Sequence, residues 1–277
     1  MDATTQPKYK LAPAQLISLI TDLTAGDQYS FLDAKSHPAL GASTVFNIPG
    51  TADEANLGRH LEAEVLQTSW GAPLDEICRW FESIESTSRF FLLIDQSAET
   101  PQLAGVLRVA DCDRGHSETI EFFHEFYGAE TALPGAIGRA IATPGTWEVV
   151  TVAVNPSFRN GRTSAWLYHA LYRASLEADI TDWIASVTPG ELRNLRRSIG
   201  IPFIETPDCP PITETHTTAD GRSKDVTFLF CTCDVSTVDI TVRSKIEQYL
   251  SREGAQGGAR SRLANTASIA LWGRESR

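Results

Sequence analysis

The sequence predicts an α/β (α+β) fold in which helices flank a mixed, mostly antiparallel central sheet. Residues 89–94 and 103–109 are rich in β-branched and large apolar side chains, and a turn-like stretch separates them, which predicts two antiparallel or neighbouring strands. Residues 147–154 have a strong strand pattern, and residues 162–178 have apolar side chains at helical spacing. This strand and the helix after it are the centre of the predicted fold.

The segment before the first of these strands, about residues 1–88, is predicted to be a helical N-terminal extension. Helical spacing of apolar side chains is found in three ranges, 12–25, 51–70 and 73–86. Pro13 suits the first turn of the first helix, and Thr51 stands three residues before Glu54 as a capping box for the second. We expect the extension to belong to one domain that covers residues 1–250.

Local patterns predict the later elements of that domain. Strands are predicted at 183–187 and 226–233, and helices at 119–127, 133–142, 191–199 and 239–250. Gly200 ends the basic helix at 191–199, and residues 205–224, which contain prolines and a polar run, are predicted to form a long surface loop. Residues 251–277 are mostly small, polar and basic, so we expect a flexible C-terminal tail.

The charge of the chain restricts its partners. The 277 residues carry a formal net charge of -11, and the isoelectric point is about 5.0. Nucleic-acid binding depends on lysines and arginines that neutralise phosphates, so we expect no nucleic-acid partner. The sequence has neither a run of 18 apolar residues nor a secretory signal pattern, so we expect a cytoplasmic protein without a membrane partner. This composition favours an enzyme that acts on small molecules.

A compact motif follows the strand at 147–154. Val154, Pro156 and Phe158 alternate at its end, and Arg159 and Gly161 lead into the long helix. This order resembles the acyl-CoA signature of the GNAT acetyltransferase superfamily, over residues 147–203 in its motifs and over about 89–230 in strand order. The resemblance implies the GNAT type of sheet, an N-acyltransferase activity, and acetyl-CoA or another acyl-CoA as the co-substrate.

In the GNAT family this turn holds the donor's pyrophosphate, because a turn that leads into a helix presents unpaired N–H groups and the positive end of the helix dipole. The pantetheine arm pairs with the end of the strand. The resemblance therefore implies a donor site that consists of Val152, Ala153, Val154, Arg159, Asn160, Gly161, Arg162, Thr163 and Ser164. Arg162 replaces the usual middle glycine of the motif, and an arginine at this position could itself pair with phosphate.

Glu148 is the candidate catalytic residue, because an amine must lose a proton before it attacks a thioester. It stands six residues before Val154, where histone-acetylating GNAT enzymes and acyl-homoserine-lactone synthases have a strand glutamate. By period two it would share a face with Val150, Val152 and Val154, and burial there would raise its pKa. The alternative is a strand-end carboxylate that is hydrogen-bonded or solvated. The lactone synthases follow their glutamate with Ser-Arg, which this chain lacks.

Two further groups of polar residues could bind a metal ion or a partner. Glu121, His124 and Glu125 would share one helix face near His116, as a metal site or as a solvated face. The five cysteines have no CxxC spacing, and GNAT chemistry needs no metal, so no metal is expected. The helix with Arg193, Arg196 and Arg197 could dock CoA phosphate or an acyl carrier protein, or could be a solvated face.

These observations predict transfer of an acyl group from acyl-CoA to the amine of a small molecule. The long segment before the motif fits a larger acceptor pocket or an acyl tunnel. The resemblance points to the long-chain N-acyl amino acid synthases and lactone synthases, which take carrier-bound acyl groups, so an acyl carrier protein is the alternative donor. Family GNAT enzymes carry a tyrosine general acid where this chain has Arg196. A degenerate GNAT fold that binds CoA or a protein partner is therefore a third interpretation, and the resemblance also allows a homodimer.

Overall fold

The computed structural model describes residues 6–112, 117–142, 144–159, 162–207, 209–217 and 223–238. The strands are β1 Ser30–Leu32, β2 Ser43–Pro49, β3 Ser88–Asp95, β4 Gln102–Asp111, β5 Thr146–Val154, β6 Asp182–Val187, β7 Ile204–Glu205, β8 Ile212–Thr217 and β9 Ser223–Asp234. The α-helices are α1 Gln6–Tyr9, α2 Pro13–Ala25, α3 Ala55–Trp70, α4 Leu74–Trp80, α5 Glu118–Tyr127, α6 Gly135–Ala142, α7 Arg162–Glu177 and α8 Pro189–Asn194. The shorter helical turns are η1 Pro38–Leu40, η2 Glu85–Thr87, η4 Pro156–Phe158, η5 Leu195–Ile199, which is π-helical, and η6 Val235–Thr237.

A mixed sheet forms the centre of the fold, as predicted. Its strand order is β1-β2-β3-β4-β5-β6-β9-β7, and β8 pairs with β9 outside this path. Among the described strands, β5 and β6 pair in parallel and every other pairing is antiparallel. No described helix is both long and apolar enough to cross a membrane.

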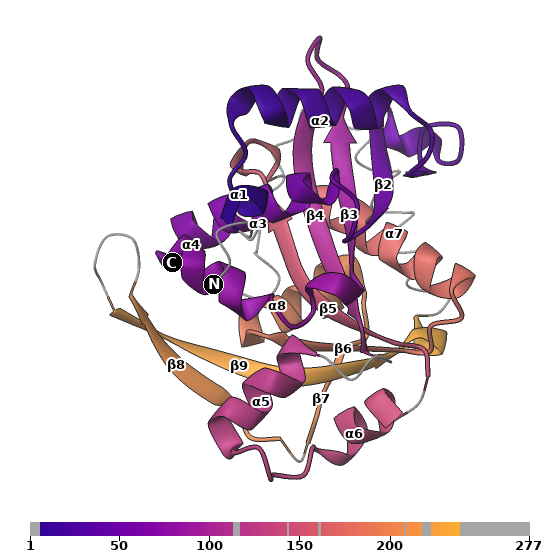
Figure 1. The fold of residues 1–277 in the computed structure, drawn as a ribbon. Helices are drawn as coiled ribbons and strands as arrows, with labels where there is room; N and C mark the ends of the chain where they lie inside the picture. The colour runs from indigo at the N-terminus through magenta and orange to yellow at the C-terminus, as the bar shows by residue number, and fades with distance from the viewer. Residues whose placement is uncertain are drawn as a thin grey trace.

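Helices cover both faces of this sheet (Figure 1). The helix α3 packs on one face, because Gly58 of α3 lies directly over Phe90 and Val106. The helix α7 packs on the other face, where Thr163 and its neighbours lie over Gly105. The central strand β5 is buried along its whole length, since it lies between these two layers.

Three local predictions were wrong. The loop predicted at 205–224 contains β8, whose alternating Thr and Glu residues pair with β9. The capping box at Thr51 does not form, because α3 starts at Ala55 after a series of turns whose backbone carbonyls accept the first N–H groups. The extension also contains β2, which pairs with β3 along its length. The helix predicted at 239–250 and the tail at 251–277 lie outside the described residues.

Candidate functional site

The parallel strands β5 and β6 pair only at their first residues. The described ladder has three rungs, Thr146 with Asp182, Trp147 with Trp183 and Glu148 with Ile184, and beyond these the strands have no pairing. On its other edge β5 remains paired with β4 as far as Val154, opposite Gly105. The end of β5 therefore has one edge that is not part of any described ladder.

Backbone groups of Val152 and Val154 point toward this open edge. Asn155 donates its N–H to the carbonyl of Ala104 at 3.0 Å, so this pair is a hydrogen-bonded pair of the antiparallel ladder. Because such pairs alternate with non-bonded ones, Val154 and Val152 turn their N–H and C=O groups away from β4. Two of the predicted donor-binding residues thus present backbone donors and acceptors to the space beside the sheet.

A β-bulge at Val150 changes which residues share a face with Glu148. Arg108 pairs with Thr151 and Val109 pairs with Val149, so Val150 is an extra residue on β5. After the bulge the alternation is reversed, and Thr151 lies on the face of Glu148, where it donates a hydrogen bond to Glu62 of α3. The predicted common face of Glu148 with Val152 and Val154 is therefore wrong, since Val154 and its partner Gly105 lie on the α7 side.

Glu148 itself is fully buried and binds the N-terminus of α5. Its carboxylate accepts the N–H groups of Glu118 at 2.9 Å and of Thr119 at 2.6 Å. Burial raises the pKa of Glu148 above its ordinary value, although the hydrogen bonds from Thr119 and Glu118 act in the opposite direction. The strand glutamate is thus desolvated, as predicted, and hydrogen-bonded to the first turn of a helix.

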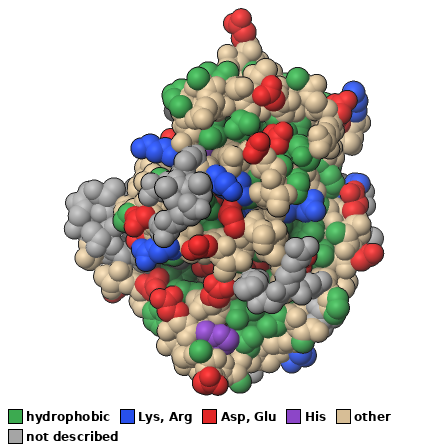
Figure 2. Space-filling view, viewed as in Figure 1, with side chains coloured by type: hydrophobic (Ala, Val, Ile, Leu, Met, Phe, Trp, Pro, Cys, Tyr) green, Lys and Arg blue, Asp and Glu red, His purple; other side chains and the backbone are tan. Residues whose placement is uncertain are grey.

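An acidic cavity of about 450 Å³ lies where α4, α5 and β8 meet. It is lined by Glu76, Arg79, Trp80, Glu118, Glu121, Phe122, Glu125, Glu214 and Thr215. Burial raises the pKa of Glu118 well above its ordinary value, and the nearby carboxylates of Glu148 and Glu121 add to this effect. Figure 2 shows acidic side chains gathered on this part of the surface. Five glutamates around one arginine make the cavity attractive to cations.

The cavity includes part of the polar cluster predicted on α5. Glu121 and Glu125 line it, His124 does not, and His116 lies outside the described residues. Within the part of the chain that the structure describes, no three His, Cys, Asp or Glu side chains are arranged to hold a metal ion. Glu118 and Glu214 were not predicted, because they come from elements almost 100 residues apart and no local pattern links them.

The segment predicted to bind the donor connects the open edge of β5 to the start of α7. Arg159 donates from Nε to the carbonyl of Val154 at 3.3 Å, and Thr163 donates from Oγ1 to the carbonyl of Phe158 at 3.1 Å. Arg162 is the first residue of α7, and Ser164 lies in its first turn. The predicted residues from Val152 to Ser164 are therefore contiguous in space where the structure describes them, while Asn160 and Gly161 lie outside the described residues.

A buried ionic network holds β4 against α3 beside the bulge. Arg108, fully buried, donates to Glu62 at 3.4 Å and to Glu85 at 2.6 Å, and Arg59 also pairs with Glu85. Burial alone would raise the pKa of Glu85, but Arg108 and Arg59 lower it below its ordinary value. This network was not predicted from the sequence. A lone arginine in an apolar strand was its signal, since such a charge is buried only with partners.

The basic helix forms as predicted and is exposed at its arginines. It consists of α8 and η5, and Gly200 ends it with a left-handed φ of 88°. Arg196 donates from Nε to the carbonyl of Phe203 at 2.7 Å, so this side chain helps to fix the end of the helix. The guanidinium of Arg196 therefore has a structural role.

Comparisons with known proteins returned no matching family model and no matching curated protein. Solved structures that resemble this chain include an AHL synthase, an N-acyl amino acid synthase and a protein of the GNAT family. The AHL synthase LasI is 19% identical, with a TM-score of 0.45, over 68% of this chain and 89% of that chain. FeeM, an N-acyl amino acid synthase from uncultured soil microbes, is 11% identical, with a TM-score of 0.44, over 70% and 92%. A protein from Desulfovibrio desulfuricans assigned to the GNAT family is 12% identical, with a TM-score of 0.42, over 70% and 100%.

Proposed function

We propose that this chain is an N-acyltransferase that moves an acyl group from acyl-CoA to the amine of a small molecule. The observation that carries the proposal is the separation of β5 from β6 after Glu148, directly before the N-terminus of α7. A strand edge with free backbone groups suits an extended amide-containing arm, and a helix N-terminus suits a phosphate. Both features lie within twenty residues of one another in the chain.

The donor would lie along the open edge of β5. Arg159 already donates a hydrogen bond to the carbonyl of Val154, so the backbone of Val152 is the better partner for the pantetheine amides. The first turn of α7, with Arg162 at its start, would receive the pyrophosphate through N–H groups and a guanidinium. The bound donor supplies an acyl group that is activated as a thioester.

The acceptor would approach from the acidic cavity, on the face of the sheet that carries Glu148. Amines are protonated near neutral pH, and five glutamates attract such cations. Glu118 lines the cavity and is joined through its N–H to Glu148. Carboxylates with raised pKa values are suited to take the proton that an ammonium must lose.

In the proposed reaction the neutral nitrogen attacks the carbonyl carbon of the thioester. A C–N bond forms, the C–S bond breaks, and the thiol leaves as a thiolate that takes up a proton. The proton of the nitrogen passes to the carboxylate pair of Glu118 and Glu148. Polarisation of the carbonyl by a backbone N–H near Val152 would stabilise the charge that develops on its oxygen.

Glu148→Gln tests the proposed pair of carboxylates, because the charge of Glu148 raises the pKa of Glu118. We expect the rate of transfer to fall by roughly 10²- to 10⁴-fold, because a general base contributes about this much, while donor affinity stays nearly unchanged. The rate of transfer is measured as release of the CoA thiol with a panel of mono- and diamines. The affinity for the donor is measured by calorimetry with acetyl-CoA. Glu177→Gln on the exposed end of α7 is the matched control. Equal activity in the Glu148 variant would remove Glu148 from the mechanism.

The donor is identified by native mass spectrometry of the purified protein. Acetyl-CoA, a long-chain acyl-CoA and an acylated carrier protein are added in turn, and a specific complex with a CoA ester supports the proposal. The exposed Arg193 and Arg197 favour the carrier protein as the second candidate, because its surface is acidic. A donor complex without product for any amine would indicate the degenerate fold instead.

A further inference from the structure

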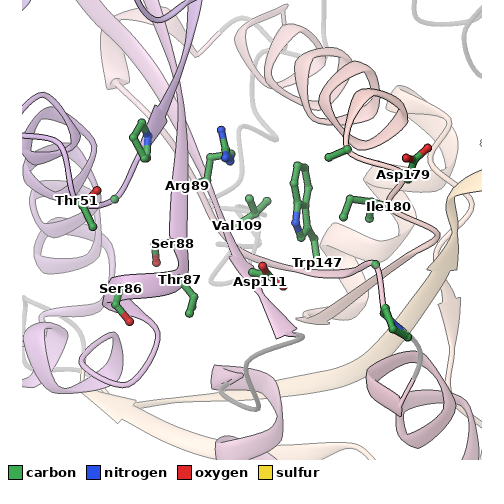
Figure 3. Close-up of a pocket in the computed structure, with 15 residues that line it drawn as sticks. Thr51, Ser86, Thr87, Ser88, Arg89, Val109, Asp111, Trp147, Asp179 and Ile180 are labelled. Carbon is green, nitrogen blue, oxygen red and sulfur yellow. The ribbon is translucent and has the colours of Figure 1, made fainter.

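A second cavity, of about 580 Å³, lies at the other end of β5 (Figure 3). It is lined by Pro49, Gly50, Thr51, Ser86, Thr87, Ser88, Arg89, Val109, Asp111, Pro144, Gly145, Trp147, Ala178, Asp179 and Ile180. These residues come from the adjacent ends of β2, β3, β4 and β5 and from the turn after α7. The proposed acyltransferase site uses none of them.

The floor of this cavity is one face of the sheet. Arg89 lies opposite Val109 across β3 and β4, and Asp111 lies opposite Trp147 across β4 and β5. Val109 and Asp111 are four and six residues after Gly105 on β4, so they share its face, which is the α7 side of the sheet. The rungs that join β5 to β6 close the sheet between this cavity and the open edge of β5. The two sites are therefore separate.

Arg89 provides the cavity with a binding group for an anion. It is half-buried, and its Nη1 donates to the neutral side chain of Asn47 at 3.1 Å. Across the described residues, no carboxylate forms an ion pair with Arg89. A guanidinium has five N–H donors in a planar fork that matches a carboxylate. The chain has a net charge of -11, and yet Arg89 has no carboxylate partner among the described residues. This arrangement favours a ligand that carries a carboxylate.

The opposite side of the cavity favours a cation. Asp179 follows the last turn of α7, where the negative end of the helix dipole adds to its charge, and Asp111 lies on the floor. Figure 3 shows Arg89 and Asp179 on opposite sides of Trp147. Between them the surface is apolar, formed by Val109, Trp147 and Ile180. We propose that this cavity binds a small zwitterion whose carboxylate and ammonium groups are at the two ends of an apolar chain, as in an ω-amino acid. Its carboxylate would lie on Arg89, its ammonium toward Asp179 and Asp111, and its apolar body on Trp147.

The first test compares ligands on the unchanged protein. 6-Aminohexanoate and 8-aminooctanoate serve as zwitterionic probes, and hexanoate and hexylamine each carry one of the two charges. Calorimetry without any acyl donor is expected to show that a zwitterion binds at least tenfold more tightly than either single-charge compound. Equal binding of the carboxylate alone, or no binding of either amino acid at millimolar concentration, overturns the proposal.

Variants then locate the site. Arg89→Met and Asp179→Asn are each expected to weaken binding of 6-aminohexanoate tenfold or more, and asparagine tolerates the positive φ of 53° at position 179. Arg173→Met, an exposed arginine of α7 paired with Glu177, is the matched control and should bind normally. Trp147→Phe should remove a ligand-induced change in tryptophan fluorescence. Normal binding by folded Arg89→Met, checked by circular dichroism, contradicts the assignment whatever the outcome of the acyl-transfer assays.

Discussion

Gly105 gives a test of the donor site that leaves every proposed contact residue unchanged. It lies on β4 opposite Val154 and beneath the first turn of α7. A Cβ atom at this position would stand 2.5 Å from Cγ2 of Thr163 and 3.2 Å from Cδ1 of Leu167. We therefore expect Gly105→Ala to push Thr163, and with it the N-terminus of α7, away from the sheet by roughly 1 Å, since carbon atoms pack at about 3.5–4.0 Å.

The displacement has two expected costs. Overpacking of this kind costs about 1–3 kcal/mol of unfolding free energy, which lowers the thermal midpoint by roughly 2–4 °C for each kcal/mol in a chain of this size. Loss of one charge-assisted hydrogen bond to phosphate costs about 1.5–3 kcal/mol, so acetyl-CoA should bind roughly tenfold to 150-fold more weakly. Calorimetry measures the affinity, and thermal unfolding followed by circular dichroism measures the stability.

Gly58→Ala is the matched control, because it creates a similar clash on the other face. Its Cβ atom would stand 2.5 Å from Cδ1 of Phe90, beneath α3. We expect a loss of stability that the helix propensity of alanine offsets by up to about 1 kcal/mol, and no change in donor affinity. If Gly105→Ala binds acetyl-CoA as the wild type does, or if Gly58→Ala weakens binding equally, the N-terminus of α7 is not the donor site.

Two further predictions concern the buried carboxylates. Arg108→Met should lower the free energy of unfolding by about 3–5 kcal/mol, because it leaves Glu62 buried without its arginine partner. In chemical denaturation, the double variant Arg108→Met/Glu62→Gln should recover part of this loss. A double variant that is no more stable than the single one would contradict the pairing. The pKa of Glu118 is higher in the folded chain than in the unfolded chain, so protonation of Glu118 favours the fold. The fold therefore loses stability as the pH rises above the ordinary pKa of glutamate and up to the raised pKa of Glu118. Glu118→Gln should therefore raise the thermal midpoint more at pH 8 than at pH 5, with Glu177→Gln as the control, and an equal shift at both values would refute this linkage.

Elements with a strong local pattern were predicted from the sequence. The strand β5 and the helix α7 have long apolar patterns of one period, and the structure has them within a residue of the predicted bounds. The hairpin of β3 and β4 was found because a turn-rich stretch separates two apolar runs. In contrast, β8 is a polar strand whose only described pairing is to β9, so its strand conformation depends on a partner and not on its own composition.

The arrangement within the candidate site depended on details that no local pattern records. Glu148 was predicted from its position six residues before Val154 in the motif, and its catalytic role stays a prediction. The reversal of faces at Val150 was missed, because a one-residue bulge is defined by pairing with β4 and not by the sequence of β5. Glu62 and Arg108 were missed for the same reason, since 46 residues separate these two partners of one ion pair.

The geometry around Glu148 also limits how a proton could reach it in the proposed reaction. Both of its oxygens accept N–H groups from the start of α5, and the side chain is fully buried, so an acceptor in the acidic cavity does not meet it directly. Glu118 lines that cavity, and its raised pKa reflects first burial and then the charge of Glu148. Because ionising one of two neighbouring carboxylates makes the other harder to ionise, the pair holds a proton more readily than either group would alone. Glu118 is therefore the group that would exchange protons with the acceptor, and Glu148 the buried charge that makes it basic enough to do so.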